Sequence, residues 1–227
     1  MIKPQAYHPM HPMGDSTMVD TSSSMTDLSG LVYIHVPKNA SCWIKYHLGQ
    51  LQSQPYNYYD NGFDTQKHLA LVVLREPVQR WISAMAQIFI GYPPDYYLTI
   101  DWNNLTKTIF RNNHTQPQHE FFANIPHDRI VWFRCDRLLE HVFQQFLSTH
   151  GLVIDPLPTS QDIDNVFNIT AKAPAKIING YNAPPQQVIV DEIHRVLQAH
   201  PEYVQRLEQL YKVDYEFFNS VPYYGTK

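Results

Sequence analysis

The sequence has little of what marks secreted, membrane-spanning or nucleic-acid-binding proteins. Its two cysteines, Cys42 and Cys135, can form at most one disulfide and match no CxxC metal pair. No apolar run approaches the ~20 residues that a membrane-spanning helix needs, and residues 1–30 lack the apolar stretch of a signal peptide. A net charge of −4 provides no basic field for nucleic acid or an anionic membrane. We therefore expect a cytoplasmic protein with no membrane anchor and no nucleic-acid partner.

Length and composition favour one domain preceded by an arm. With 227 residues and 44% hydrophobic content, the chain can bury one sizeable core. Residues 1–29 are rich in Met, Pro, His, Ser and Thr and show little periodicity, which is typical of a flexible segment. We predict a flexible arm over residues 1–29 and a single domain over residues 30–227.

Apolar runs alternate with amphipathic stretches along the domain. Three runs predict buried strands: Leu31–Val36, Leu69–Leu74 and Arg129–Phe133. Amphipathic spacing predicts helices that start near Ser41, Pro77, Trp102 and Leu138. Ser41 is the expected cap of the first helix, and the helix from Trp102 is expected to end near Arg111. This alternation predicts an α/β domain with a mostly parallel sheet.

The first predicted strand turns directly into a helix through Pro37-Lys38-Asn39-Ala40-Ser41-Cys42-Trp43. A helix N-terminus presents unpaired N–H groups and a partial positive charge, so this turn is a candidate anion site. Lys38 adds a mobile charge, Ser41 and Cys42 add side-chain donors, and the ring of Trp43 can pack beside a nucleotide. The glycines of the nucleotide kinases' G-x-x-x-x-G-K-[ST] loop are absent, so the turn does not indicate a kinase.

The second predicted strand ends in Arg75-Glu76-Pro77-Val78-Gln79-Arg80-Trp81-Ile82-Ser83. Arg75 leaves the sheet edge, and Ser83 lies about two helical turns further on, so both can face one bound phosphate. Taken singly, Arg75 could equally be a salt-bridge partner at the sheet edge and Ser83 an ordinary helix serine. Their order after the first loop favours the phosphate hypothesis.

Together, the two motifs resemble those of sulfotransferases that use 3′-phosphoadenosine 5′-phosphosulfate (PAPS). The family patterns are Pro-Lys-x-Gly-[ST]-[ST] for the 5′-phosphosulfate and Arg-[DE]-Pro-x-x-Arg-x-x-Ser for the 3′-phosphate. Ala40 replaces the usual glycine, and Cys42 replaces a hydroxyl residue. His114–Gln118 (HTQPQ) and Leu210–Phe218 resemble the carbohydrate sulfotransferase branch, which includes chondroitin and dermatan enzymes, so the likeness covers about residues 31–220. Members of that branch are usually Golgi membrane proteins, and this chain resembles a compact soluble relative of bacterial or viral type.

The resemblance implies a P-loop-like three-layer fold with a central, mostly parallel sheet flanked by helices. It implies transfer of a sulfuryl group from PAPS to a hydroxyl acceptor. Because the likeness is to the carbohydrate branch, we expect that acceptor to be a carbohydrate. Residues 37–43 would bind the phosphosulfate, Arg75 and Ser83 the 3′-phosphate, and Lys38 would stabilise the leaving group. No metal is expected.

The catalytic base remains open among four residues. His114 is favoured because it belongs to the family-like segment and because histidine titrates near neutral pH. His47, His68 and Glu120 are alternatives. The rival hypothesis for the whole chain is a catalytically degenerate module that binds a nucleotide or a glycan.

Overall fold

The computed structural model describes residues 31–50, 64, 66–92, 99–109, 112–149, 177–178, 181–182 and 184–221. The predicted arm, residues 1–29, lies outside them. The first half of the described chain contains β1 (Leu31–Tyr33), α1 (Ser41–Gln50), β2 (Leu69–Leu74), α2 (Pro77–Phe89), α3 (Trp102–Leu105) and the 3₁₀ helices η3 (Gln118–Phe121) and η4 (His127–Arg129). The second half contains β3 (Ile130–Arg134), α4 (Leu139–Thr149), β4 (Ile177–Ile178), β5 (Tyr181–Asn182), α6 (Gln186–Ala199), α7 (Pro201–Leu210) and α8 (Lys212–Ser220).

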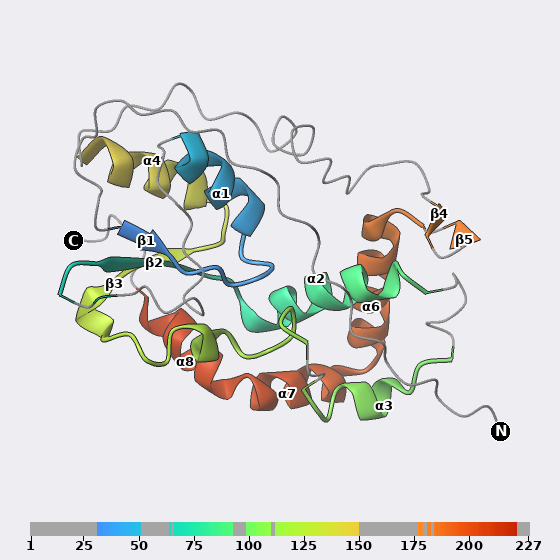
Figure 1. Ribbon diagram of the computed structural model, residues 1–227. Helices are drawn as coiled ribbons and strands as arrows, with labels where there is room; N and C mark the ends of the chain where they lie inside the picture. The colour runs from blue at the N-terminus through green and yellow to red at the C-terminus, as the bar shows by residue number, and fades with distance from the viewer. Residues whose placement is uncertain are drawn as a thin grey trace.

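A sheet of three parallel strands carries both candidate phosphate-binding motifs. The strand order is β1-β2-β3, with Leu31 opposite Leu69 and Ala70 opposite Ile130 (Figure 1). Parallel strands end at the same edge of a sheet. The loop after β1 and Arg75 after β2 therefore meet at one edge. The predicted α/β class with a parallel sheet is confirmed for the described residues.

Alternate side chains of β2 belong to two hydrophobic cores, one on each face of the sheet. Leu71 and Val73 face the cluster that α1 and α4 complete, whereas Val72 and Leu74 face η3 and α8. Figure 1 shows α1 and α4 above the strands and α8 below them. Because both faces are covered, β2 is apolar along its whole length, as expected of a central parallel strand.

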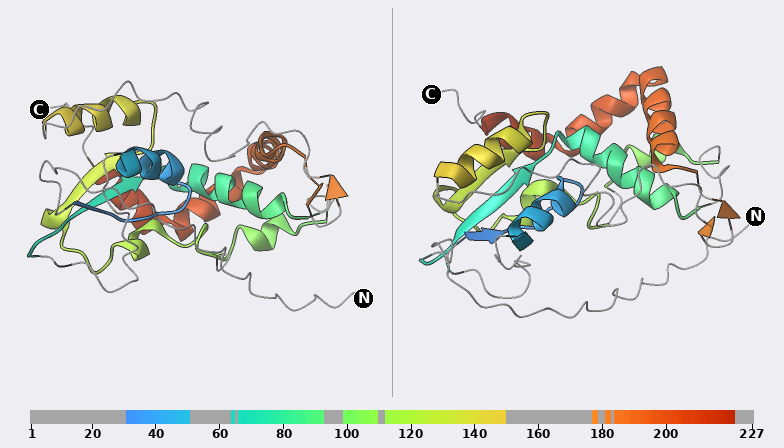
Figure 2. Two further views of the ribbon diagram at one scale, coloured as in Figure 1. Left: turned by 45° about the horizontal axis from the view of Figure 1, so that its top comes forward. Right: turned by 90° about the horizontal axis from the view of Figure 1, so that it is seen from above.

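Beyond the sheet edge, α2 continues into a helical cluster with α6 and α7. The right-hand view of Figure 2 shows α6 crossing beside α2 at the end far from the sheet. The apolar stripe predicted for α2 is the face that is buried here. The buried members of this cluster are Val78, Trp81, Ile82, Met85, Ala86, Phe89, Ile189, Ile193, Leu197, Leu207 and Tyr211.

Three local predictions differ from the structure. The helix from Trp102 ends at Leu105 instead of near Arg111, because the Lys107 N–H donates to the Asn104 carbonyl, three residues back, at 3.1 Å and the i→i−4 series does not continue. The antiparallel pair β4 and β5 was not predicted, since two-residue strands carry too few side chains for a periodic pattern. Ala40 takes the cap position expected for Ser41, because its carbonyl accepts the first helical bond, 3.0 Å from the Ile44 nitrogen.

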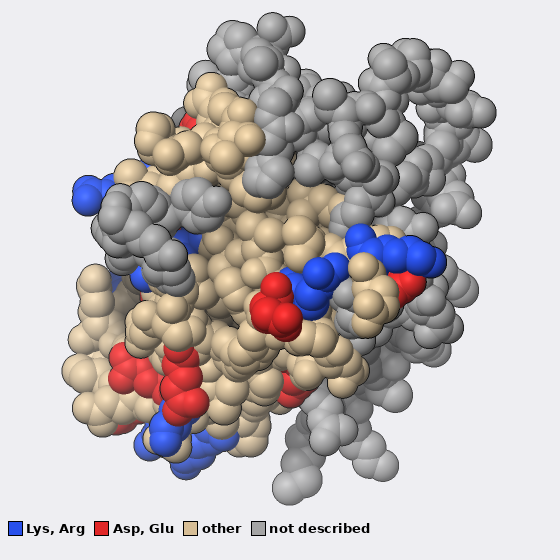
Figure 3. Space-filling model, turned by 90° about the vertical axis from the view of Figure 1, so that its left-hand side faces the viewer, with Lys and Arg blue, Asp and Glu red and all other residues tan. Residues whose placement is uncertain are grey.

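None of the described helices combines the length and apolarity required to cross a bilayer. The face seen in Figure 3 carries acidic and basic side chains in small mixed groups. Cys42 is exposed, Cys135 is half-buried, and both are free thiols.

The face covered by α1 and α4 provides a test of the core. The fully buried ring of Phe143 packs edge-on against Trp43 and Phe133, at centroid distances of 5.4 and 5.5 Å. We predict that Phe143→Ala lowers the free energy of unfolding by about 3–5 kcal/mol, through lost contacts and the cavity left behind. Glu140→Ala, at an exposed position of the same helix, is the control and should change it by less than about 0.5 kcal/mol. Urea unfolding measures both; equal effects would contradict the packing described.

Candidate donor site

The loop after β1 has an unusual backbone. Lys38 and Ala40 have φ values of 71° and 55°, and they are the non-glycine residues with positive φ in the described part of the chain. Asn39, between them, does not share this conformation. Left-handed residues in a turn can direct backbone N–H groups toward a bound anion, as in a backbone anion nest. The N–H groups of Ser41, Cys42 and Trp43 follow as the first of α1, and they have no acceptor within the helix.

Two buried amide side chains hold this loop against the end of β2. Asn39 Nδ2 donates to the Val73 carbonyl and to Gln118 Oε1, both at 2.6 Å. Gln118 also pairs with the backbone of Arg75: its Oε1 accepts from the Arg75 nitrogen at 3.0 Å, and its Nε2 donates to the Arg75 carbonyl at 2.8 Å. Because the Asn39 side chain is fully buried, it positions the loop and does not extend toward a ligand.

Two arginines converge on the carbonyl groups of the same loop. Arg75 Nη1 donates to the Lys38 carbonyl at 3.1 Å. The side chain of Arg80 is buried, and its Nε donates to the Pro37 carbonyl at 2.9 Å. Its two terminal nitrogens reach the carbonyls of Gln116 at 2.6 Å and Asn113 at 3.3 Å. Arg80 thus joins the donor loop to the segment that carries His114.

A buried carboxylate supports this arrangement from α8. Asp214 accepts hydrogen bonds from the backbone nitrogens of Gln118 at 2.7 Å and His119 at 2.9 Å. It also contacts His119 Nδ1 at 2.8 Å, and this hydrogen bond raises the pKa of His119 above its ordinary value. The oxygens of Asp214 are therefore occupied by groups that hold Gln118 in place.

The positive charges at the loop form no ion pair with the carboxylates that the structure describes. Among the ion pairs between described residues, none includes Lys38, Arg75 or Arg80. Burial lowers the pKa of Lys38 to about 8, and the neighbouring charges of Arg75 and Arg80 add to the decrease. Burial lowers the pKa of Arg80 to about 10, so this side chain stays charged at neutral pH. Mutually repelling cations beside a helix N-terminus form a site suited to an anion with several charges.

His114 lies within the electrostatic influence of these cations. Burial, followed by the charges of Lys38 and Arg80, lowers the pKa of His114 to about 4, so the ring is neutral at pH 7. Asn112 Oδ1 accepts from the backbone nitrogen of His114 at 2.9 Å and lies 2.8 Å from Nδ1. An amide oxygen can only accept, so Nδ1 carries the proton. Nε2 therefore keeps its lone pair and can act as a base.

The other three candidate bases occupy different surroundings. His47 is fully buried and packs edge-on against Trp43 at 4.3 Å, and burial lowers its pKa to about 4. His68 precedes β2 and so lies at the opposite edge of the sheet, about 20 Å from Arg75 at about 3.3 Å per residue. Glu120 is exposed, and its Oε2 accepts from Gln116 Nε2 at 2.8 Å. Of the four, His114 is the one linked to the donor loop through Arg80.

The remaining predicted donor residues are placed as follows. Ser41 and Cys42 stand at the first turn of α1, half-buried and exposed respectively. The Trp43 ring packs onto Phe143 at the α4 face, so it contributes to the core. Ser83 is half-buried on α2, and its carbonyl accepts a long bond of 3.5 Å from Gln186. No contact among the described residues joins the Ser83 side chain to Arg75.

Sequence reasoning assigned no role to three residues on which this geometry depends: Arg80, Gln118 and Asp214. Arg80 is the second arginine of the motif that begins at Arg75, and Gln118 ends the HTQPQ segment. Because both lie in motifs that the sequence already shows, their importance could have been predicted. Asp214 lies in the family-like segment Leu210–Phe218, but its pairing with Gln118, 96 residues away, appears only in the fold.

Comparisons of the chain with protein-family models, with curated proteins and with solved structures each found no match. In the described part of the chain, no three His, Cys, Asp or Glu residues are grouped as metal ligands would be. The assignment of a function therefore depends on the residues and geometry above.

The backbone at Ala40 provides a test of the loop. A left-handed conformation strains any residue with a Cβ, and glycine relieves that strain. We predict that Ala40→Gly raises the free energy of unfolding by about 0.5–1 kcal/mol. Ala199→Gly, in the last turn of α6 with negative φ, is the control and should lower it by up to about 1 kcal/mol. If thermal or urea unfolding finds both variants destabilised, the left-handed geometry at Ala40 is refuted.

Proposed function

We propose that this protein is a sulfotransferase that moves a sulfuryl group from PAPS to a hydroxyl acceptor, on a P-loop-like three-layer fold. The observation that carries the proposal is the convergence of Lys38 and Arg75 at the N-terminus of α1, where neither pairs with a carboxylate that the structure describes. PAPS carries two separate groups of negative charge, a 3′-phosphate and a 5′-phosphosulfate. Two motifs at one sheet edge match a ligand of that kind, and each motif follows its own strand.

Each residue then has a role consistent with its place. The N–H groups of residues 40–43 and the Lys38 ammonium would hold the 5′-phosphosulfate, while Arg75 and Ser83 would hold the 3′-phosphate. Arg75 also stabilises the loop, since its Nη1 donates a hydrogen bond to the Lys38 carbonyl. The strained backbone at Lys38 and Ala40 is reasonable at a ligand site, where a fixed conformation is maintained by surrounding contacts.

The reaction we propose is an in-line displacement at sulfur. The acceptor oxygen forms a bond to sulfur as the bond between sulfur and the bridging phosphate oxygen breaks. The acceptor proton passes to His114 Nε2, and 3′-phosphoadenosine 5′-phosphate leaves. Lys38 stabilises the negative charge that develops on the bridging oxygen, which is electrostatic catalysis by a positioned cation. By analogy with phosphoryl transfer, positioning and electrostatics supply most of the rate.

Binding of the product nucleotide tests the donor site directly. We predict that 3′-phosphoadenosine 5′-phosphate raises the melting temperature, because a ligand that binds only the folded state stabilises it. Arg75→Ala and Lys38→Ala should each weaken its binding about tenfold or more, since each removes a charge-assisted contact. Lys212→Ala, at an exposed position of α8, is the control and should bind normally.

Two ligand comparisons sharpen this experiment. Adenosine 5′-monophosphate lacks the 3′-phosphate and should bind more weakly than the product nucleotide to the wild-type protein. In Arg75→Ala this difference should shrink. No binding of 3′-phosphoadenosine 5′-phosphate would refute the sulfotransferase proposal. Binding without transfer of labelled sulfate to any glycan, lipid or phenol acceptor would favour the degenerate module.

The pKa values of Lys38 and His114 predict a pH dependence. Below pH 8 Lys38 is charged; as the pH rises through about 8 the free protein loses this proton, so affinity for the nucleotide should fall. Lys38→Arg should remove that decline, because arginine stays charged. His114 takes up a proton only near pH 4, so kcat/KM should fall on the acid side toward about 4.

Replacement of the base separates catalysis from binding. His114→Ala should lower kcat by about 10²–10⁴-fold while nucleotide affinity stays within about twofold of wild type. Initial rates with labelled PAPS and titration calorimetry measure the two quantities. An unchanged kcat would show that another residue acts as the base. Glu120→Gln would then be the next variant to measure.

A further inference from the structure

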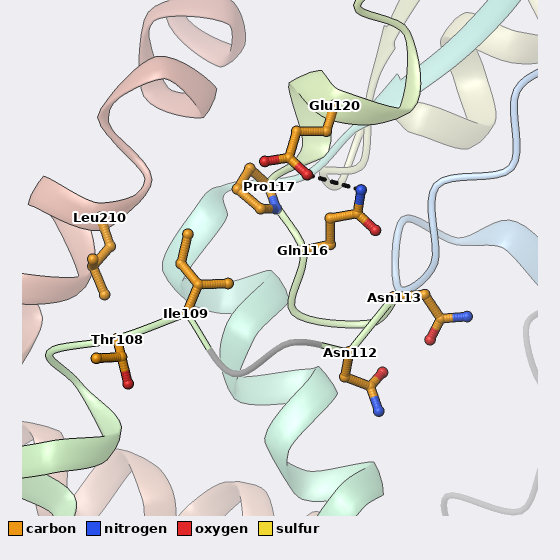
Figure 4. A pocket seen from close by; sticks show the side chains of 8 residues that line it. All are labelled: Thr108, Ile109, Asn112, Asn113, Gln116, Pro117, Glu120 and Leu210. Carbon is orange, nitrogen blue, oxygen red and sulfur yellow. Dashed lines mark hydrogen bonds between the residues drawn. The ribbon is translucent and has the colours of Figure 1, made fainter. Parts of the chain in front are cut away.

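A pocket of about 910 Å³ opens beside the segment that carries His114 (Figure 4). Asn112 and Asn113, the two residues before His114, contribute to its wall. Asn112 also holds the His114 ring through its amide oxygen. A molecule in this pocket would therefore contact the residue that orients the ring of the proposed base.

The wall of the pocket is tied to the donor loop by one side chain. Arg80 donates to the carbonyls of Gln116 and Asn113, both in the lining, and through Nε to the carbonyl of Pro37 in the loop. The two regions are thus held in a fixed relation by a single planar, buried guanidinium. This relation is what a transfer between two bound substrates requires.

The lining combines two kinds of surface. Figure 4 shows the amides of Asn112, Asn113 and Gln116 on one side, with Ile109 and Leu210 on the other. Side-chain amides both donate and accept, so they match hydroxyl groups, which do the same. Apolar side chains accommodate the C–H faces of a ring. This combination fits a molecule with many hydroxyl groups on a carbon ring.

Glu120 provides the charge of this pocket. It is the only ionisable side chain among the described residues that line it, and Gln116 Nε2 donates to its Oε2 at 2.8 Å. Glu120 would repel a sulfate or carboxylate on an acceptor, and none of the described lining residues is a cation that would compensate this repulsion. Repulsion between two negative charges lowers the affinity for an anionic ligand, so the pocket discriminates against such ligands.

We infer that this pocket binds the acceptor of the proposed reaction, and that the acceptor is an uncharged saccharide carrying neither sulfate nor carboxylate at the bound residue. The inference rests on the proposed sulfotransferase function, because His114 and the donor loop give the pocket its role. Amides select the hydroxyl groups, and Glu120 excludes anionic sugars.

Binding of matched saccharides to the full chain, saturated with 3′-phosphoadenosine 5′-phosphate, tests this inference. The ligands are cellotriose, maltotriose and triacetylchitotriose, each compared with its 6-carboxylated form by titration calorimetry or saturation-transfer NMR. We expect at least one neutral trisaccharide to bind about tenfold or more tightly than its carboxylated form. Glu120→Gln, which keeps the shape of the side chain, should reduce that ratio to within about threefold.

Two further variants separate the pocket from the rest of the surface. Thr108 is exposed and lines the pocket, so Thr108→Trp should fill it and weaken saccharide binding about tenfold or more without affecting the core. Glu140→Gln, at an exposed position of α4, removes an equal charge elsewhere and should change neither affinity nor selectivity.

The outcomes distinguish this inference from the proposed function. If the nucleotide fails to bind, the sulfotransferase proposal itself is wrong. If the nucleotide binds but no neutral trisaccharide binds at millimolar concentration, or the carboxylated forms bind more tightly, only the acceptor inference is overturned. An unchanged affinity in Thr108→Trp would also overturn it, since the saccharide would then lie outside this pocket.

Discussion

The buried guanidinium of Arg80 is the interaction on which the rest of the site depends. It donates hydrogen bonds to the Pro37 carbonyl in the loop after β1 and to the Gln116 and Asn113 carbonyls, which belong to a segment more than 70 residues later than Pro37. A buried charge is costly unless its donors are satisfied, and three carbonyls together with the nearby ring of Phe121 provide partners. Movement of either segment would leave part of this charge unpaired, so the donor loop and the His114 segment are held together.

The distribution of charge follows from this arrangement. Asp214 is the acidic group that helps to keep Arg80 charged, but its oxygens are occupied by the N–H groups of Gln118 and His119. Lys38 and Arg75 form no ion pair with any carboxylate that the structure describes. Such a cluster reduces stability in the free protein, and this cost is typical of sites whose charge is reserved for a ligand. Glu120, the acidic group of the adjoining pocket, accepts a hydrogen bond from Gln116.

Much of the fold could be predicted because its signals are local. The apolar run Leu69–Leu74 defines a central strand by composition alone, and Pro77 marks the start of α2 by its fixed φ. The short helix from Trp102 shows where local signals are insufficient, since its apolar spacing continues past Leu105 although the i→i−4 hydrogen bonds do not. The cap of α1 was misplaced for a related reason, because positive φ at Ala40 cannot be recognised in an alanine.

By itself, the sequence determined the parallel α/β class, and it pointed to two candidate phosphate-binding motifs and to the candidate residues Lys38, Arg75 and His114. These depend on strand and helix periodicity and on residues close together in the chain. Only the tertiary structure decided which candidates meet, because parallel strands bring segments far apart in sequence to one edge. It set His68 at the opposite edge and enclosed His47 in the core. Contacts such as that between Asp214 and Gln118 exist only after the chain has folded.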